Sequence, residues 1–115
     1  MATKPTAKEK RLELDAKLIA LLEEVYGKGK AHLYFQPPEG FKMTYPCIIY
    51  QRDTGDHRFA DNKVYNFKQA YQLTFMSKDP DNEVIDKILE NFQYAKYGRH
   101  FRTDNVNHDV VILYY

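Results

Sequence analysis

The chain has 115 residues, of which 43% are hydrophobic and 29% are charged, and this composition excludes a wholly disordered protein. The formal net charge of +1 gives no support for binding to nucleic acid or membranes through overall charge, and the single cysteine excludes an internal disulfide. The length suits one domain, residues 1–115, and we find neither an apolar run of about 18 residues for a membrane span nor the apolar core of a signal peptide.

The N-terminal part of the chain predicts a flexible segment followed by an amphipathic helix. Residues 1–5 are polar and have no periodic pattern, so we expect them to be flexible. Residues 6–9 (Thr-Ala-Lys-Glu) are a capping-box sequence, in which the first and last side chains satisfy backbone N–H groups at a helix start. Leucines then recur at helical spacing, and Gly27 suits a helix end. These features predict a helix at about residues 6–26.

The middle of the chain predicts three strands. Residues 32–36 are a short, largely apolar segment that ends at two prolines, which cannot donate hydrogen bonds to a strand ladder. Residues 46–51 are almost continuously apolar, as is typical of a central strand buried on both faces. Residues 69–77 alternate in polarity, which indicates a half-buried strand with Tyr71 and Phe75 on its buried face.

The C-terminal part predicts a second helix and two further strands. Asp79 is a suitable N-cap and Pro80 suits the first helical position, so we expect a helix that runs from there to about residue 93. Phe101 is expected in a short strand. Residues 104–107 have turn composition, and residues 109–115 predict a terminal strand that is apolar on both faces.

These elements predict an α+β fold. It consists of a single, mostly antiparallel β-sheet of four to six strands packed by two α-helices, with a protruding hairpin or loop at about residues 53–67. Each helix has one apolar stripe to bury, and the sheet is the partner available to both.

The histidines and the cysteine give little indication of chemistry. His108 and Asp109, near His100 and Asp104, are the grouping that a metal site or an enzyme would use, but a turn whose side chains bond the backbone explains the same residues. Cys47 lies in the most apolar predicted strand, where a thiol is a small inert hydrophobe. Nucleophile-elbow and phosphate-loop motifs are absent. We therefore expect no enzyme, no catalytic residue, no metal and no cofactor.

A basic cluster at residues 99–102 is the densest in the sequence. Its arginines, Arg99 and Arg102, have Tyr94 and Tyr97 nearby, and this combination can bind single-stranded nucleic acid by stacking and phosphate contacts. The same residue types are favoured at protein interfaces and in surfaces that line a lumen. The near-neutral net charge argues against the nucleic-acid alternative, so Arg99 and Arg102 are candidate contacts with other subunits or partners.

The long polar segment 53–67 is the second candidate contact region. Loops of this length in a compact domain are often functional. The segment mixes both signs of charge, which suits a contact between subunits, and an idle flexible hairpin is the alternative. The candidate contact residues in it are Asp56, His57, Arg58, Phe59, Asp61, Asn62 and Lys63.

Five segments follow one another in a characteristic order in the last two thirds of the chain. They are Tyr-Pro-Cys-Ile-Ile-Tyr at residues 45–50, Arg-Phe-Ala-Asp-Asn-Lys at 58–63, Tyr-Gln-Leu-Thr at 71–74, Asp-Pro-Asp-Asn at 79–82, and Phe-Arg-Thr-Asp-Asn-Val-Asn-His-Asp-Val at 101–110. This succession, over residues 43–115, resembles the tail-terminator and neck (head-to-tail joining) proteins of tailed bacteriophages. The N-terminal helix is similar only in kind.

The resemblance implies a structural role in the virion. Members of this family form a ring, typically a hexamer, at the head-proximal end of the tail tube, where it terminates tail polymerisation and joins the tail to the head connector. The implied partners are further copies of the chain, the tail tube protein and the head-tail connector proteins. Genomic DNA would pass through the lumen without sequence-specific binding, and no membrane is involved. The protein would be assembled in the host cytoplasm and reside in the neck of the virion.

Two alternatives stay open at this point. One is another neck ring, such as a tail-completion or head-closure protein, which the sequence does not separate from a terminator. The other, which we favour less, is a small nucleic-acid-binding module.

Overall fold

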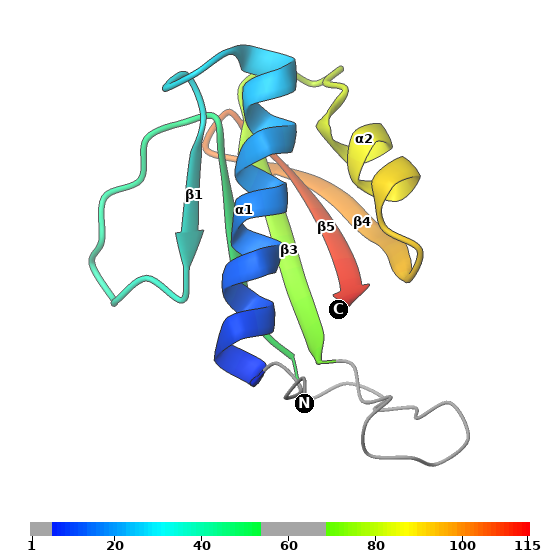
Figure 1. Ribbon diagram of the computed structural model, residues 1–115. Helices are drawn as coiled ribbons and strands as arrows, with labels where there is room; N and C mark the ends of the chain where they lie inside the picture. Colours follow the sequence, from blue (N-terminus) through cyan, green and yellow to red (C-terminus); the bar gives the residue numbers. More distant parts are fainter. Residues whose placement is uncertain (1–5, 54–68) are drawn as a thin grey trace, which may run out of the picture.

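The computed structural model describes residues 6–53 and 69–115, and Figure 1 shows how they are arranged. These residues form two helices and one five-stranded sheet. The elements in chain order are α1 (Ala7–Tyr26), β1 (His32–Phe35), β2 (Cys47–Arg52), β3 (Ala70–Ser77), α2 (Val84–Asn91), β4 (Ala95–Thr103) and β5 (Val106–Tyr114). The strands lie in the sheet in the order β1-β2-β3-β5-β4.

The sheet is mixed but mostly antiparallel. β1 runs parallel to β2, whereas β3 is antiparallel to both β2 and β5, and β4 is antiparallel to β5. The predicted α+β class, with two helices and a single sheet of four to six strands, is confirmed. The protruding hairpin or loop that the sequence predicts falls mainly on residues 54–68, which lie outside the described residues.

The first helix begins and ends as the sequence predicts. The Thr6 side chain accepts a hydrogen bond from the Glu9 backbone N–H at 3.1 Å, and the Glu9 carboxylate accepts one from the Thr6 N–H at 3.0 Å, which completes a capping box. After Tyr26 the chain turns at Gly27, whose φ of 94° lies in the region that glycine adopts most readily. Local chemistry alone therefore fixes both ends of α1.

Both helices pack on the same face of the sheet, as Figure 1 shows for α1 and α2. The main core lies between them and the sheet, and it contains apolar side chains from α1, α2, β2, β3 and β5. The predicted alternation of β3 is confirmed, because Tyr71, Leu73 and Phe75 are buried in this core, while Gln72 and Thr74 point to the opposite face and are half-buried. Burial of one such large side chain stabilises the fold by about 1.5–3 kcal/mol.

The opposite face of the sheet carries a smaller buried cluster. Cys47, Met76 and Val106 form it, and the partly buried Tyr34 and Met43 pack against it. Within residues 6–53 and 69–115 no helix lies on this face. The prediction that β2 is buried on both faces holds for the first part of the strand, where Cys47 belongs to the smaller cluster with Ile49 packed against it, and Ile48 and Tyr50 belong to the main core.

A polar contact fixes α1 over the β1–β2 edge. The Tyr50 hydroxyl donates a hydrogen bond to the Asp15 carboxylate at 2.7 Å and accepts one from the Arg11 guanidinium at 3.1 Å. That guanidinium also lies 4.3 Å from the centre of the Phe35 ring. Burial raises the pKa of Tyr50, so its hydroxyl stays protonated and keeps donating at neutral pH.

The predicted start of the second helix is wrong. The helix begins at Val84, not at Pro80, and it ends at Asn91. The Asp79 side chain accepts a hydrogen bond from the Asp81 N–H at 3.0 Å, and Asn82 accepts one from the Val84 N–H at 3.1 Å. Because these side chains bond to backbone groups two residues further on, they stabilise successive turns in the segment where the sequence predicts the first helical turn.

The C-terminal hairpin is longer than predicted. β4 has nine residues instead of the short strand expected around Phe101, and β5 begins at Val106 rather than at Asp109. The turn between them consists of Asp104 and Asn105, with φ values of 52° and 63°. Aspartate and asparagine tolerate this left-handed conformation, which allows the tightest hairpin and leaves more residues for the strands.

Candidate functional site

The contact residues that the sequence predicts fall in two parts of the chain, the segment 56–63 and the strand β4. Asp56, His57, Arg58, Phe59, Asp61, Asn62 and Lys63 all lie outside the described residues. The other two predicted contacts, Arg99 and Arg102, lie on β4. The described part of the candidate site is therefore the strand β4 and the neighbouring residues of β5.

β4 is the long edge strand of the sheet. Within the part of the chain that the structure describes, it pairs only with β5, and eight of its nine residues are exposed. Two of its large aromatic side chains are among the exposed ones, with 42% of Tyr97 and 37% of Phe101 accessible to solvent. The other edge strand, β1, has only four residues, all of them half-buried. An exposed strand edge is a template for pairing with another chain, so β4 is the stronger candidate for assembly.

Arg99 and Arg102 lie on the same strand but on opposite faces of the sheet. Arg99 lies opposite Val110 in the ladder and its guanidinium is 5.1 Å from the centre of the Phe101 ring. Arg102 lies opposite Asn107 and donates a hydrogen bond to the Asn105 side chain at 3.3 Å. Because successive side chains of a strand alternate between faces, the basic cluster of the sequence is split into two halves.

A polar cluster at β4 and β5 contains His100 and Asp109, which the sequence grouped with His108 and Asp104, and it adds Tyr97, which that grouping left out. The Tyr97 hydroxyl donates a hydrogen bond to the Asp109 carboxylate at 2.9 Å, and His100 Nδ1 lies 2.7 Å from the same oxygen. Asp109 is only 6% exposed, so these two partners satisfy a carboxylate that would be costly to bury alone. Burial, together with the hydrogen bond to Asp109, raises the pKa of Tyr97.

The register of the hairpin decides which of the two histidines that the sequence grouped with Asp109 contacts its side chain. His108 and Asp109 are adjacent, so they point to opposite faces, and His108 stacks instead on Phe101 with ring centres 4.6 Å apart. A two-residue turn at Asp104 and Asn105 places His100 directly opposite Asp109. Recognising that turn would have predicted this pair from the sequence. The contact of Tyr97 with the same carboxylate also depends on an irregularity at Gly98, which shifts the register.

The described residues include no group suited to a metal. No cluster of three or more histidine, cysteine, aspartate or glutamate side chains occurs within residues 6–53 and 69–115. Cys47 is fully buried, and burial raises the pKa of its thiol to about 11. A buried, protonated thiol is a poor nucleophile, as the sequence analysis expected of this residue.

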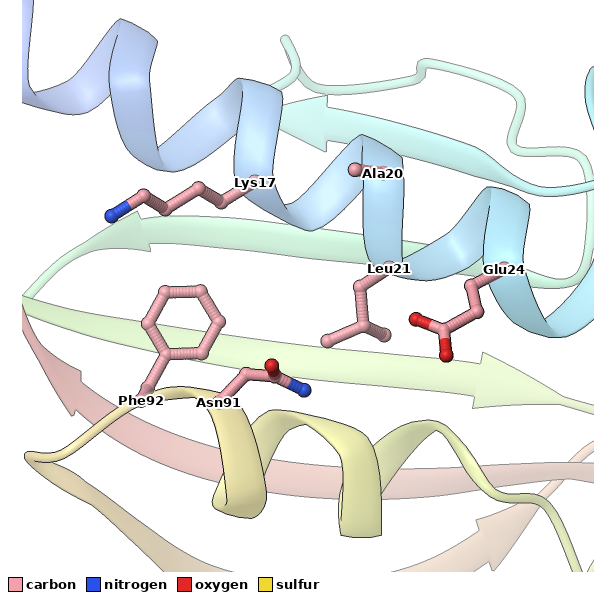
Figure 2. Close-up of a pocket in the computed structure, with 6 residues that line it drawn as sticks. All are labelled: Lys17, Ala20, Leu21, Glu24, Asn91 and Phe92. Carbon is pink, nitrogen blue, oxygen red and sulfur yellow. The ribbon is translucent and has the colours of Figure 1, made fainter.

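A hollow of about 340 Å³ lies between the two helices (Figure 2). Leu21 and Glu24 point into it from α1, and Asn91 and Phe92 enter from the end of α2. The Glu24 carboxylate already accepts a hydrogen bond from the Lys87 amine at 2.9 Å. The polar lining of the hollow thus takes part in a contact between α1 and α2 at the surface. We interpret the hollow as a gap in the packing of the two helices.

The comparisons with known proteins do not identify a family. No protein-family model and no curated protein matches the chain. The described helices include none with the length and apolar character needed to cross a membrane.

Proposed function

We propose that this chain is a structural protein of the neck of a tailed-phage virion. It forms a homo-oligomeric ring, hexameric by analogy with the family that it resembles, at the head-proximal end of the tail tube. The ring terminates tail polymerisation and joins the tail to the head connector proteins. Genomic DNA passes through its lumen without sequence-specific binding, and the ring assembles in the host cytoplasm.

The observation that carries this proposal is the asymmetry of the sheet. Both helices cover one face, and β4 is left as a long exposed edge with exposed aromatic side chains. Such surfaces serve contacts between proteins rather than chemistry on small molecules. The order of segments over residues 43–115, which resembles the neck proteins, supports the specific role in the phage neck. A closed ring forms when each subunit binds its neighbour through two different surfaces that are related by a rotation.

A terminator and a neighbouring neck ring, such as a tail-completion or head-closure protein, share these features. They differ in what happens to the tail when the protein is removed. Without a terminator, tube subunits continue to add and the tails become longer than normal. Without a head-closure protein, tails keep their length but do not join to filled heads.

The experiment has two parts. Size-exclusion chromatography with light scattering measures the mass of the purified full-length chain, alone and with tail tubes, and we expect a species of about six chains in at least one of these conditions. Electron microscopy of particles produced with and without the protein then measures tail length and head attachment. A chain that stays monomeric and never associates with tails would contradict the proposal.

A further inference from the structure

The β4 edge is basic along its whole length. Its nine residues include Lys96, Arg99 and Arg102 and no aspartate or glutamate. Among the described residues, no carboxylate forms an ion pair with any of these three cations, whereas the nearby His100 is paired with Asp109. Three cations on one exposed strand, with no carboxylate partner among the described residues, create a local positive potential in a chain whose net charge is only +1.

The backbone of β4 also has hydrogen-bonding groups that point away from β5. In a two-residue hairpin, the residues next to the turn, here Thr103 and Val106, bond to each other, and bonded and non-bonded pairs then alternate along the ladder. Arg102 and His100 fall in the non-bonded positions. Their N–H and C=O groups therefore point out of the sheet edge, where a further strand would accept and donate hydrogen bonds.

The division of the cations between the two faces of the sheet favours a strand over nucleic acid as the occupant. A nucleic acid strand lying on one face would meet Arg99 or Arg102, but not both. It would also find the Phe101 ring already in contact with Arg99 and His108. A strand added in the plane of the sheet alternates its own side chains over both faces, so it reaches every cation of the edge.

The same charges disfavour pairing of β4 with the β4 of a second copy. That arrangement would bring the arginines of two identical strands together without any carboxylate to compensate them. Cationic side chains on an edge strand are a known protection against self-association. They exclude a like-charged strand and leave the edge available to an oppositely charged one.

We propose that the β4 edge binds an extended acidic segment of a partner protein, which adds to the sheet as a further strand. The backbone groups of His100 and Arg102 provide hydrogen bonds, and the three cations select glutamate- or aspartate-rich sequences. This inference goes beyond the proposed function, because it assigns β4 to a partner and does not require that the chain forms a ring.

The test uses the full-length chain and short peptides with blocked ends. The first peptide has nine residues and consists of glutamate and valine; the second has the same composition except for prolines at alternate positions, which remove the N–H donors needed for a ladder. Fluorescence anisotropy of labelled peptides measures affinity, and changes in backbone amide NMR signals locate the site. We expect the first peptide to bind with the largest changes at His100 and Arg102, and the proline peptide to bind at least about tenfold more weakly.

Charge reversal provides the matched control. The double variant Arg99→Glu/Arg102→Glu should bind the acidic peptide about tenfold more weakly or worse, and it should bind a peptide with lysine in place of glutamate better than the unmodified protein does. The variant Lys28→Glu/Lys30→Glu makes the same change in net charge in the exposed turn before β1, at the other edge of the sheet, and should leave binding unchanged.

Several results would overturn the inference. Equal binding of the proline peptide would show attraction by charge without strand addition. Failure of the acidic peptide to bind, or binding of a nine-nucleotide single-stranded DNA in its place, would rule out an acidic strand as the occupant. The proposed ring is tested by mass and microscopy, so either proposal can fail while the other stands.

Discussion

The two sides of this molecule differ in what their residues contact. On the helix-covered face, Leu18 of α1 and Ile88 of α2 are fully buried against the sheet, and they belong to one core with apolar side chains of β2, β3 and β5. On β4, eight of nine residues are exposed and the cations have no acidic partner among the described residues. The comparison indicates that stability resides in the buried clusters on the two faces of the sheet and contacts with other molecules in β4, and four predictions test this division.

The largest expected effect is in the core. Leu18→Ala removes a fully buried side chain and leaves a cavity, so we expect the free energy of unfolding to fall by about 3–5 kcal/mol. The matched control is Leu12→Ala in the same helix, where the side chain is 48% exposed and the change should stay within about 0.5 kcal/mol. Urea denaturation followed by circular dichroism measures both, and similar losses for the two variants would contradict the assignment of the core.

The second effect is a loss of stability at alkaline pH that depends on Cys47. In the unfolded chain the pKa of this thiol is its ordinary value of 9.0, whereas in the folded protein burial raises it to about 11. Between these values the unfolded state binds fewer protons, so the free energy of unfolding falls as the pH rises through this window, by roughly 2–3 kcal/mol from this group.

Buried tyrosines contribute in the same direction, because burial raises the pKa of Tyr50 and Tyr71 as well. The variant Cys47→Ala separates the contributions. The stability difference between the unmodified protein and this variant should shrink as the pH rises from 8 to 11, as measured by urea denaturation at each pH. A difference that stays constant with pH would mean that the thiol is accessible to water in the folded state.

A smaller effect is expected at the border between the two regions. Asp109→Ala removes the acceptor of Tyr97 and His100, and because both partners reach solvent we expect a loss of only about 1 kcal/mol. The pKa of Tyr97 should fall toward its ordinary value, which ultraviolet titration of the tyrosines measures. Asp109→Asn keeps an oxygen acceptor and should retain part of the stability. A pKa of Tyr97 that does not change would show that the hydrogen bond is not formed in solution.

The smallest effect on stability belongs to the exposed edge. Arg99→Ala/Arg102→Ala should change the free energy of unfolding by less than about 0.5 kcal/mol, because neither side chain is buried or in an ion pair with a described carboxylate. Thermal denaturation measures this change, and binding assays with tails or with the acidic peptide report the function of the same variant. A strongly destabilised variant would mean that these arginines support the fold.

The sequence by itself determined the elements whose signals are local. The capping box at Thr6 and Glu9 and the stop at Gly27 depend on bonds within one helix, and the alternation of Tyr71, Leu73 and Phe75 depends only on which positions of a strand face the core. These features predicted the fold class. The start of α2 was predicted wrongly because an aspartate side chain can accept a backbone hydrogen bond either as a helix N-cap or within a turn. Asp79 forms the turn contact, with the Asp81 N–H, and the residue type alone does not distinguish the two.

The candidate site was decided by the tertiary structure. The sequence showed Arg99 and Arg102 as one basic cluster, and it could not show that β4 lies at the edge of the sheet or that the two arginines point to opposite faces. His100 and Asp109 are nine residues apart in the sequence, but the hairpin brings His100 Nδ1 to 2.7 Å from a carboxylate oxygen of Asp109. Strand order and register depend on contacts between distant residues, and a change of one residue in register moves every side chain to the other face.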